Sequence, residues 1–142
     1  MTASRVFLSH TGQDARLVEN LKRVLDEAFL GAIDFFASSD DHSLLPGARW
    51  QDEVLRALGE AQLLIVICTP ESVSRPWINF EAGAGVALQR RVIPVCCQGT
   101  TKGGLPSPLS MFQAVDGADP ADVDALIESL ALPQRRTCGH LR

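Results

Sequence analysis

The hexapeptide Leu63–Cys68 is apolar at every position, and this run restricts the fold more than any other feature. A strand that is apolar on both faces is typical of the middle of a parallel sheet covered by helices. Strand-like runs at Arg5–Ser9, Ile33–Phe36 and Val92–Cys97 alternate along the chain with helical patterns. This alternation predicts an α/β fold with a doubly wound parallel sheet, right-handed crossovers and helices on both faces. With a short edge strand at Phe112–Val115, the sheet has five strands and suits the flavodoxin-like order 2-1-3-4-5.

The helices are predicted from apolar residues that recur every three or four positions. Four helices are expected. The first follows the capping-box pattern Thr11–Asp14, and the second runs from Trp50 to Gly59. The third contains Trp77, and the fourth follows Asp119 and Pro120. Gly31 is expected to end the first of them. Ala37–Gly47 and Gln98–Ser110 are predicted loops, because glycine, proline and aspartate gather there. Residues 1–132 are interpreted as one domain, and residues 133–142 as a tail or the start of a linker.

Size and charge exclude several classes of protein. With 142 residues and a net charge of −4, the chain has the length of one domain and lacks the basic surface that duplex binding normally requires. Its longest apolar run is too short to cross a bilayer, and the N-terminus has no long apolar stretch of a secretory signal. We therefore expect a cytoplasmic protein with no membrane partner and no direct nucleic-acid partner. The four cysteines, Cys68, Cys96, Cys97 and Cys138, are expected to be reduced, and no residues have metal-ligand spacing.

Two residues of the third helix indicate a ligand site. Trp77 and Glu81 are four residues apart and therefore share one helix face. Doubly wound sheets bind ligands beyond the carboxyl ends of their strands where the strand order reverses, so the loops after Ser9 and after Cys68 should meet there. An aromatic plane and a carboxylate at this place can hold a sugar or a nucleotide. Gly83–Gly85 lies within the helix pattern and is interpreted as a close approach to the sheet, not as a dinucleotide-binding turn.

Several segments follow one another in a distinctive order. They are Arg5–His10, Asp14, Pro46–Trp50, the apolar strand Leu63–Cys68, Ser74–Trp77 with Glu81, and Arg91–Val95. This order and spacing resemble the Toll/interleukin-1 receptor (TIR) domain family, and its bacterial members in particular. The resemblance extends over residues 4–132.

Some members of that family only assemble signalling complexes, whereas others cleave NAD⁺ with a glutamate on a helix. The resemblance implies that NAD⁺ is the substrate and that no other cofactor is needed, with Glu81 catalytic and Trp77 shaping the pocket. It also implies that residues 37–47 gate the site and help TIR domains dock in a homo-oligomer or filament. A fused or associated sensor module would activate such a domain in bacterial defence or signalling. The other residues expected to contact the substrate are Ser9, His10, Thr11, Gly12, Phe36, Asp40, Asp41 and Arg49.

Several of these candidates also have a structural interpretation. In that interpretation Glu81 is a solvated helix residue, and Trp77 is a core or interface anchor. Ser9 and Asp14 are helix caps, and His10 is a surface residue. Asp40 and Asp41 form turns, and Arg49 is a solvated residue at a helix start. Two other functions stay open. One is a non-enzymatic adaptor or host-mimicking effector. The other is a nucleoside deoxyribosyltransferase-like enzyme, which shares the sheet and uses a glutamate at an anomeric carbon.

Overall fold

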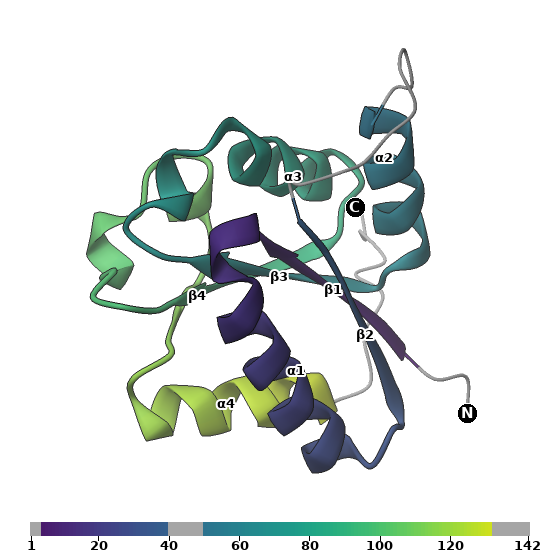
Figure 1. Ribbon diagram of the computed structural model, residues 1–142, viewed down its shortest axis with the longest axis vertical. Helices are drawn as coiled ribbons and strands as arrows, with labels where there is room; N and C mark the ends of the chain where they lie inside the picture. Colours follow the sequence, from purple (N-terminus) through teal and green to yellow (C-terminus); the bar gives the residue numbers. More distant parts are fainter. Residues whose placement is uncertain (1–3, 40–49, 132–142) are drawn as a thin grey trace, which may run out of the picture.

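The computed structural model of the chain describes residues 4–39 and 50–131. Within these residues the sheet has five parallel strands in the order β2-β1-β3-β4-β5 (Figure 1). The strands are β1 Ser4–His10, β2 Ile33–Ser39, β3 Leu63–Cys68, β4 Arg91–Cys96 and β5 Val115–Asp116. The predicted flavodoxin-like order is confirmed, and it places β1 beside β3 where the strand order reverses.

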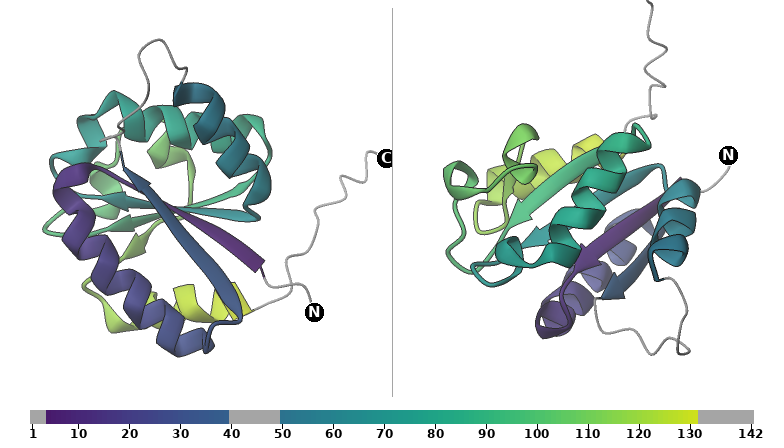
Figure 2. Two further views of the ribbon diagram at one scale, coloured as in Figure 1. Left: turned by 45° about the vertical axis from the view of Figure 1, so that its right-hand side comes forward. Right: turned by 90° about the horizontal axis from the view of Figure 1, so that it is seen from above.

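Helices cover both faces of this sheet (Figures 1 and 2). They are α1 Ala15–Phe29, α2 Trp50–Glu60, α3 Pro76–Ala87 and α4 Pro120–Ala131. One apolar cluster joins Phe7 of β1 to α2 and α3 through Leu58 and Ile78, and we call this side of the sheet the α3 face. A second cluster joins Leu8 of β1 to α1 and α4 through Val18 and Leu126, and we call this side the α1 face. Because neighbouring residues of a strand point to opposite faces, β1 contributes to both clusters.

The central strand β3 has the predicted bounds, and each of its residues is buried. Helix α3 lies close to this strand at Gly85, where a Cβ would come within 3.2 Å of Cδ2 of Leu64 and 2.9 Å of Cγ2 of Val92. The predicted close approach of the helix to the sheet is therefore confirmed at Gly85. At Gly83 an added Cβ would meet nothing within 4 Å, so the prediction does not hold there.

The second strand is longer than predicted. β2 continues to Ser39, because residues 37–39 pair with residues 8–10 of β1. The predicted loop Ala37–Gly47 therefore starts too early, and residues 40–47 lie outside the described part of the chain. Pairing with a neighbouring strand has overridden the weak strand propensity of Ala37, Ser38 and Ser39.

The edge of the sheet also differs from the prediction. β4 begins and ends one residue earlier than expected, and β5 pairs only through Val115 and Asp116, whereas Phe112 packs against the α3-face cluster. Pro94 gives the physical reason. It is paired with Val66 of β3, and since proline has no N–H, its backbone must face the β5 side. A longer edge strand would find no donor at Pro94, which agrees with the restriction of proline to sheet edges.

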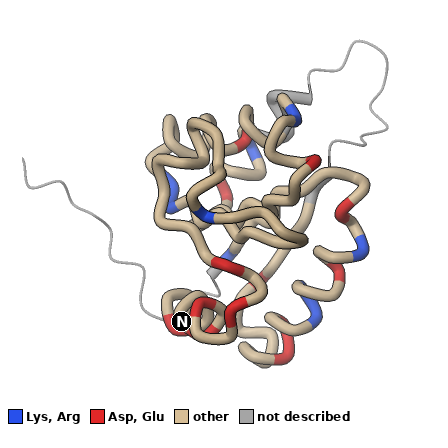
Figure 3. The backbone as a smooth tube through the Cα atoms, turned by 90° about the vertical axis from the view of Figure 1, so that its left-hand side faces the viewer, with Lys and Arg blue, Asp and Glu red and all other residues tan. Residues whose placement is uncertain are grey.

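The predicted loop Gln98–Ser110 contains the short 3-10 turn η3 Lys102–Gly104, and a second such turn, η4 Leu109–Met111, begins at its end. Basic and acidic residues are interspersed along the described backbone (Figure 3), as in the ion pair of Lys22 with Asp26 on α1. None of the helices within residues 4–39 and 50–131 combines the length and the apolar character needed to span a membrane.

Candidate functional site

Buried polar side chains gather where β1 and β3 end. The buried polar or charged residues of the described chain are Ser9, His10, Thr11, Asp14, Thr69, Ser72 and Glu81. They come from the carboxyl end of β1, from the segments after β1 and β3, and from α3. Since buried polar groups are rare in protein cores and normally serve a bonding or functional role, this group is the candidate site.

The carboxylate of Asp14 joins the segments that follow β1 and β3. Its Oδ2 accepts hydrogen bonds from the hydroxyl groups of Thr11 and Thr69, each at 3.0 Å. The loops after Ser9 and after Cys68 therefore meet, as predicted. The predicted capping box is wrong, because neither Thr11 nor Asp14 caps a helix with its side chain. The carboxylate binds the two hydroxyl groups instead.

Hydrogen bonds also hold the connection from β3 to α3. Thr69 Oγ1 accepts the N–H of Ser72 at 3.2 Å, and Ser72 Oγ accepts the N–H of Thr69 at 2.8 Å. Ser72 begins the 3-10 turn η2 Ser72–Ser74. The Asn79 side-chain amide then donates to the carbonyl oxygens of Val73 at 3.0 Å and Arg75 at 3.1 Å. The first turn of α3 is thus fixed to the turn before it.

Glu81 lies on the side of α3 that faces the sheet. Its side chain has no exposed surface, like those of Ile78 and Ala82. The interpretation of Glu81 as a solvated helix residue is therefore wrong. Residues 78, 81, 82 and 85 follow the spacing of one helix stripe, and this stripe packs inward. A glutamate in such a stripe is an informative exception, because burying a charged side chain is costly unless its charge is compensated.

The register of the strands gives the level at which Glu81 lies. Gly85 packs over Leu64 and Val92. Glu81 is one helical turn nearer the start of α3, about 6 Å along the helix axis. Two strand residues span about 6.6 Å, so Glu81 lies at about the level of Val66, which is paired with Ser9 of β1.

Ser9 is on the same face of the sheet as Glu81. Phe7 belongs to the α3-face cluster, and alternation along β1 directs Ser9 to the same side. Ser9 is fully buried, and its hydroxyl has no hydrogen-bond partner in the described part of the chain. The alternative interpretation as a helix cap is wrong, because Thr11 and Asp14 occupy the cap positions of η1 Gly12–Asp14 and α1.

His10 is 6% exposed, so the expectation of a surface residue is wrong. Its Nδ1 lies 3.4 Å from the carbonyl oxygen of Leu8. Alternation along β1 directs His10 to the α1 face together with Leu8, on the other side of the sheet from Glu81. The burial follows from the position of β1, which has a strand on each side and helices on both faces.

Three further candidates lie within the described chain. The Thr11 hydroxyl is bound to Asp14, and Gly12 is exposed at the start of η1. Phe36 of β2 is partly buried on the α3 face, with its ring centroid 5.1 Å from that of Phe7 and 4.5 Å from the guanidinium carbon of Arg5. The structure thus brings Ser9, Phe36 and Glu81 to one face.

The side chains of the remaining candidates lie outside the described part of the structure. Trp77 is the second residue of α3, one turn before Glu81, and its side chain is not among the described ones. Asp40, Asp41 and Arg49 lie outside the described residues.

Thr69 and Ser72 are members of the site that sequence reasoning did not name as such. The pair Thr69-Pro70 does signal a turn that leads towards a helix. The hydrogen bond from Thr69 to Asp14, however, joins residues 55 positions apart, and no local pattern shows such a contact.

Three cysteines lie near this edge of the sheet, and their thiol form is favoured at neutral pH. Cys68, Cys96 and Cys97 are free, and the first two are buried. Burial raises the pKa of all three thiols, and for Cys97 to about 11. Because the reactive form of cysteine is the thiolate, a raised pKa disfavours these thiols as nucleophiles. Within residues 4–39 and 50–131, no cluster of His, Cys, Asp and Glu could hold a metal ion.

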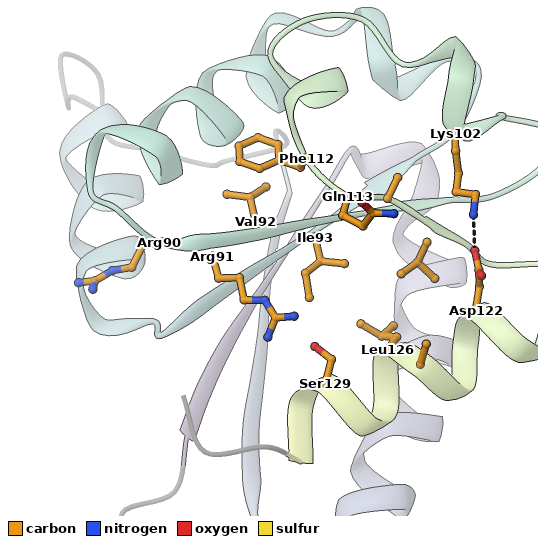
Figure 4. Close-up of a pocket in the computed structure, with 13 residues that line it drawn as sticks. Arg90, Arg91, Val92, Ile93, Lys102, Phe112, Gln113, Asp122, Leu126 and Ser129 are labelled. Atoms are coloured by element: carbon orange, nitrogen blue, oxygen red, sulfur yellow. Dashed lines mark hydrogen bonds and ion pairs between the residues drawn. The ribbon is translucent and has the colours of Figure 1, made fainter. Parts of the chain in front are cut away.

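A cavity of about 460 Å³ lies elsewhere, between β4 and α4 (Figure 4). The side chains of Arg91, Ile93, Gln113 and Ser129 contribute to its lining, and the ion pair of Lys102 with Asp122 borders it at 2.8 Å. Neither Ser9 nor Glu81 lines this cavity. It is therefore separate from the group of buried polar residues.

The family model of the TIR domain matches residues 6–130, which include most of β1 and nearly all of α4. The chain belongs to the TIR domain family. In this TIR domain, the buried polar group described above lies within the matched residues.

Solved structures show the same fold. This TIR domain is similar to the TIR domain of the Toll-related receptor TRR-2 from Hydra magnipapillata, with a TM-score of 0.67 and 17% identity over 89% of this chain and 98% of that chain. It is also similar to a metazoan TIR-STING receptor from C. gigas in complex with 2′,3′-cGAMP, with a TM-score of 0.62 and 21% identity over 90% of this chain. The chain spans only 39% of the length of that receptor.

A third similar structure is the CMP N-glycosidase BcmB from Clostridium botulinum, with a TM-score of 0.57 and 12% identity over 92% of this chain and 100% of that chain. Identities this low show that the TIR domain shares the fold, and nothing more. A search of the curated proteins finds no match to the chain.

Proposed function

We propose that this TIR domain cleaves the bond between nicotinamide and ribose in NAD⁺, with Glu81 as the catalytic carboxylate. The observation that carries the proposal is the complete burial of Glu81 on α3, at the level of Ser9 where the strand order reverses. A helix that only packs on a sheet favours apolar residues at such a position. The presence of the Glu81 carboxylate at this position therefore favours a chemical role for it.

One carboxylate is sufficient for this reaction. Nicotinamide is attached as a cation and leaves as a neutral amide, so the leaving group needs no proton. The anomeric carbon of the ribose then develops positive charge, as in other glycoside cleavages. A carboxylate beside this carbon stabilises the charge or bonds to the carbon transiently. Water that adds to the carbon and loses a proton gives ADP-ribose, and attack by a group of the same molecule gives a cyclic isomer.

Ser9 is the second side chain that the proposal uses. Its buried hydroxyl has no partner in the described chain and lies on the same face as Glu81. A ribose hydroxyl group bound there would satisfy the Ser9 hydroxyl and place the anomeric carbon beside the carboxylate. Trp77, one turn before Glu81, is proposed to shape the pocket on the nicotinamide side.

Glu81 has no exposed surface, so the proposal requires that the segments covering it separate before NAD⁺ enters. A ligand or partner drives such a change only if it binds the open form more tightly. We therefore propose that TIR domains activate one another by assembly. The isolated domain is expected to be weakly active, with activity that rises more steeply than the protein concentration.

The comparisons support parts of this proposal. One protein of the same fold is named as an N-glycosidase that acts on CMP, which fits cleavage of a sugar–base bond by this fold. Another is a receptor that carries a TIR unit and binds 2′,3′-cGAMP. By analogy we propose that this TIR domain works with a sensor module, in a cytoplasmic protein of bacterial defence or signalling.

The test is release of nicotinamide from NAD⁺, followed by chromatography over a range of protein concentrations. Wild-type protein should release nicotinamide, and Glu81→Gln and Glu81→Ala should each reduce the rate at least about 100-fold. Glu128→Gln is the matched control, because Glu128 is an exposed glutamate on α4. It should keep the wild-type rate.

The same assay separates the alternatives. No release by wild-type protein at any concentration would leave a TIR domain that only assembles complexes. Transfer of deoxyribose from a deoxynucleoside to a second base, with no reaction of NAD⁺, would identify a deoxyribosyltransferase-like enzyme. Unchanged activity of Glu81→Gln would contradict the role of Glu81.

A further inference from the structure

Asp14 binds two loops with one oxygen atom. The hydroxyl groups of Thr11 and Thr69 both donate to Oδ2 of Asp14 at 3.0 Å. Asp14 is 8% exposed, and both threonines are 2% exposed. Hydrogen bonds to a carboxylate are stronger than those between neutral groups, and burial strengthens them further. This contact therefore resists separation of the segments after β1 and β3.

Thr69 passes this constraint on to the turn that precedes α3. Its hydroxyl group donates to Asp14 and accepts the N–H of Ser72 at 3.2 Å. The carbonyl oxygen of Thr69 accepts the N–H of Val73, also at 3.2 Å. Ser72 Oγ in turn donates to the carbonyl oxygen of Ile67 at 3.0 Å, which anchors the turn to β3. Residues 69–73 are thus held to β3 and to Asp14 together.

Asn79 connects this turn with the helix that carries Glu81. Its side-chain amide donates to the carbonyl oxygens of Val73 and Arg75, and Asn79 is two residues before Glu81. Hydrogen bonds therefore connect Asp14, through Thr69 and residues 70–75, to the first turn of α3, which lies next to Glu81. On the other side, Asp14 follows Ser9 by five residues and holds Thr11 of the same segment.

We propose that Asp14 and Thr69 are positioning residues that fix the helix carrying Glu81 relative to the segment Ser9–Asp14. The inference rests on the proposed function of Glu81. Neither residue needs to touch NAD⁺. Their effect is to keep the carboxylate of Glu81 and the hydroxyl of Ser9 in one arrangement, and a misplacement of about 1 Å in such a site lowers rates by about 100-fold.

Thr69→Val is the central test, because valine keeps the shape of the side chain and removes the hydroxyl group. We expect kcat for nicotinamide release to fall about 10- to 100-fold with little change in KM, since the loss concerns catalytic geometry and not ground-state binding. Thr69→Ser restores the hydroxyl group and should recover most of kcat. Asp14→Ala removes the acceptor of both hydroxyl groups, so it should lower kcat at least as much as Thr69→Val. The double variant should be no worse than Asp14→Ala alone, because the contact between Asp14 and Thr69 is already lost in that variant.

A second measurement is independent of activity. Amide hydrogen exchange of the folded variants should be faster in residues 71–75 and 11–14 of Thr69→Val than in wild type and Thr69→Ser, with β3 unchanged. A Thr69→Val protein with wild-type kcat, or with a lowered melting temperature alone, would overturn the positioning role. If wild-type protein released no nicotinamide, the proposed function would fail. The exchange comparison would then still decide whether Asp14 and Thr69 fix α3, and unchanged exchange would refute it.

Discussion

Gly85 of α3 lies so close to Val92 of β4 that a Cβ at residue 85 would come within 2.9 Å of Val92 Cγ2. Such a contact is shorter than real Cβ atoms show, so either the Val92 side chain or one of the two elements would have to move. Val92 is β-branched and has few rotamers with which to retreat. The absence of a side chain at residue 85 therefore sets the distance between α3 and the sheet, and with it the depth of Glu81 one turn earlier.

Gly85→Ala should destabilise the protein by up to about 2 kcal/mol, because overpacking the contact of α3 with the sheet costs about 1–3 kcal/mol and the better helix propensity of alanine returns about 1 kcal/mol. Gly83→Ala is the matched control. It lies in the same helix, a methyl group added there would meet nothing within 4 Å, and alanine is the better helix former by about 1 kcal/mol. The free energy of unfolding in urea should fall for the first variant and rise for the second. Equal effects would show that α3 does not press on the sheet at Gly85.

The central elements of the fold could be predicted because their runs of apolar residues indicate burial. Leu63–Cys68 is apolar on both faces, and the structure gives β3 these bounds. Elements at the margins depend on neighbours that a sequence does not show. Ala37, Ser38 and Ser39 have no strand pattern, yet they pair with β1. Conversely, Phe112 has high strand propensity but lies outside β5, because Pro94 offers no donor at the edge of β4.

The candidate site could also be predicted only in part. The spacing of Trp77 and Glu81 places both residues on one helix face, but α3 is apolar nearly all round, so the sequence could not show that Glu81 is fully buried. The bond between Asp14 and Thr69 does not follow from any spacing. Asp14 near a helix start favours a cap on statistical grounds, whereas the folded chain brings it a second hydroxyl group from a distant loop. Contacts of this kind depend on tertiary structure.

Leu30→Asn should stabilise the protein. Leu30 follows α1 in the left-handed conformation with φ of 51°, and it is 92% exposed, so it contributes strain and little packing. Asparagine adopts this conformation more readily, and the gain should be about 0.5–1 kcal/mol. Leu88→Asn is the control, since Leu88 follows α3 with φ of −86° and has no such strain to relieve. A higher melting temperature is expected for Leu30→Asn only, and no gain there would argue against strain at Leu30.

Stability should depend on the Cys97 thiol at alkaline pH. Burial, followed by the charges near it, raises the pKa of Cys97 from 9.0 to about 11 in the folded protein. Between these values the folded state binds more protons than the unfolded state, so stability falls as the pH rises. Urea unfolding of wild type and Cys97→Ala at pH 8, 9 and 10 isolates this effect, because the other titrating groups are common to both. The stability advantage of wild type should shrink with pH, and a constant advantage would contradict the shift.

Asp122 should matter more for stability than its ion-pair partner Lys102. Asp122 Oδ2 accepts hydrogen bonds from Lys102 Nζ at 2.8 Å and from the N–H of Asp116 at 2.9 Å, and so it links α4 to β5. Lys102→Ala removes only an exposed partner, whereas Asp122→Ala also strips the Asp116 amide of its acceptor. The hydrogen bonds from Lys102 and then Asp116 lower the pKa of Asp122, so its contribution is complete above about pH 4 and is lost as the pH falls through the lowered value. The melting temperature of Asp122→Ala should therefore be lower than that of Lys102→Ala at pH 7. The difference in melting temperature between wild type and Asp122→Ala should become smaller in acid. The reverse ranking would show that the exposed ion pair, not the bond to the Asp116 amide, holds α4 to the edge strand.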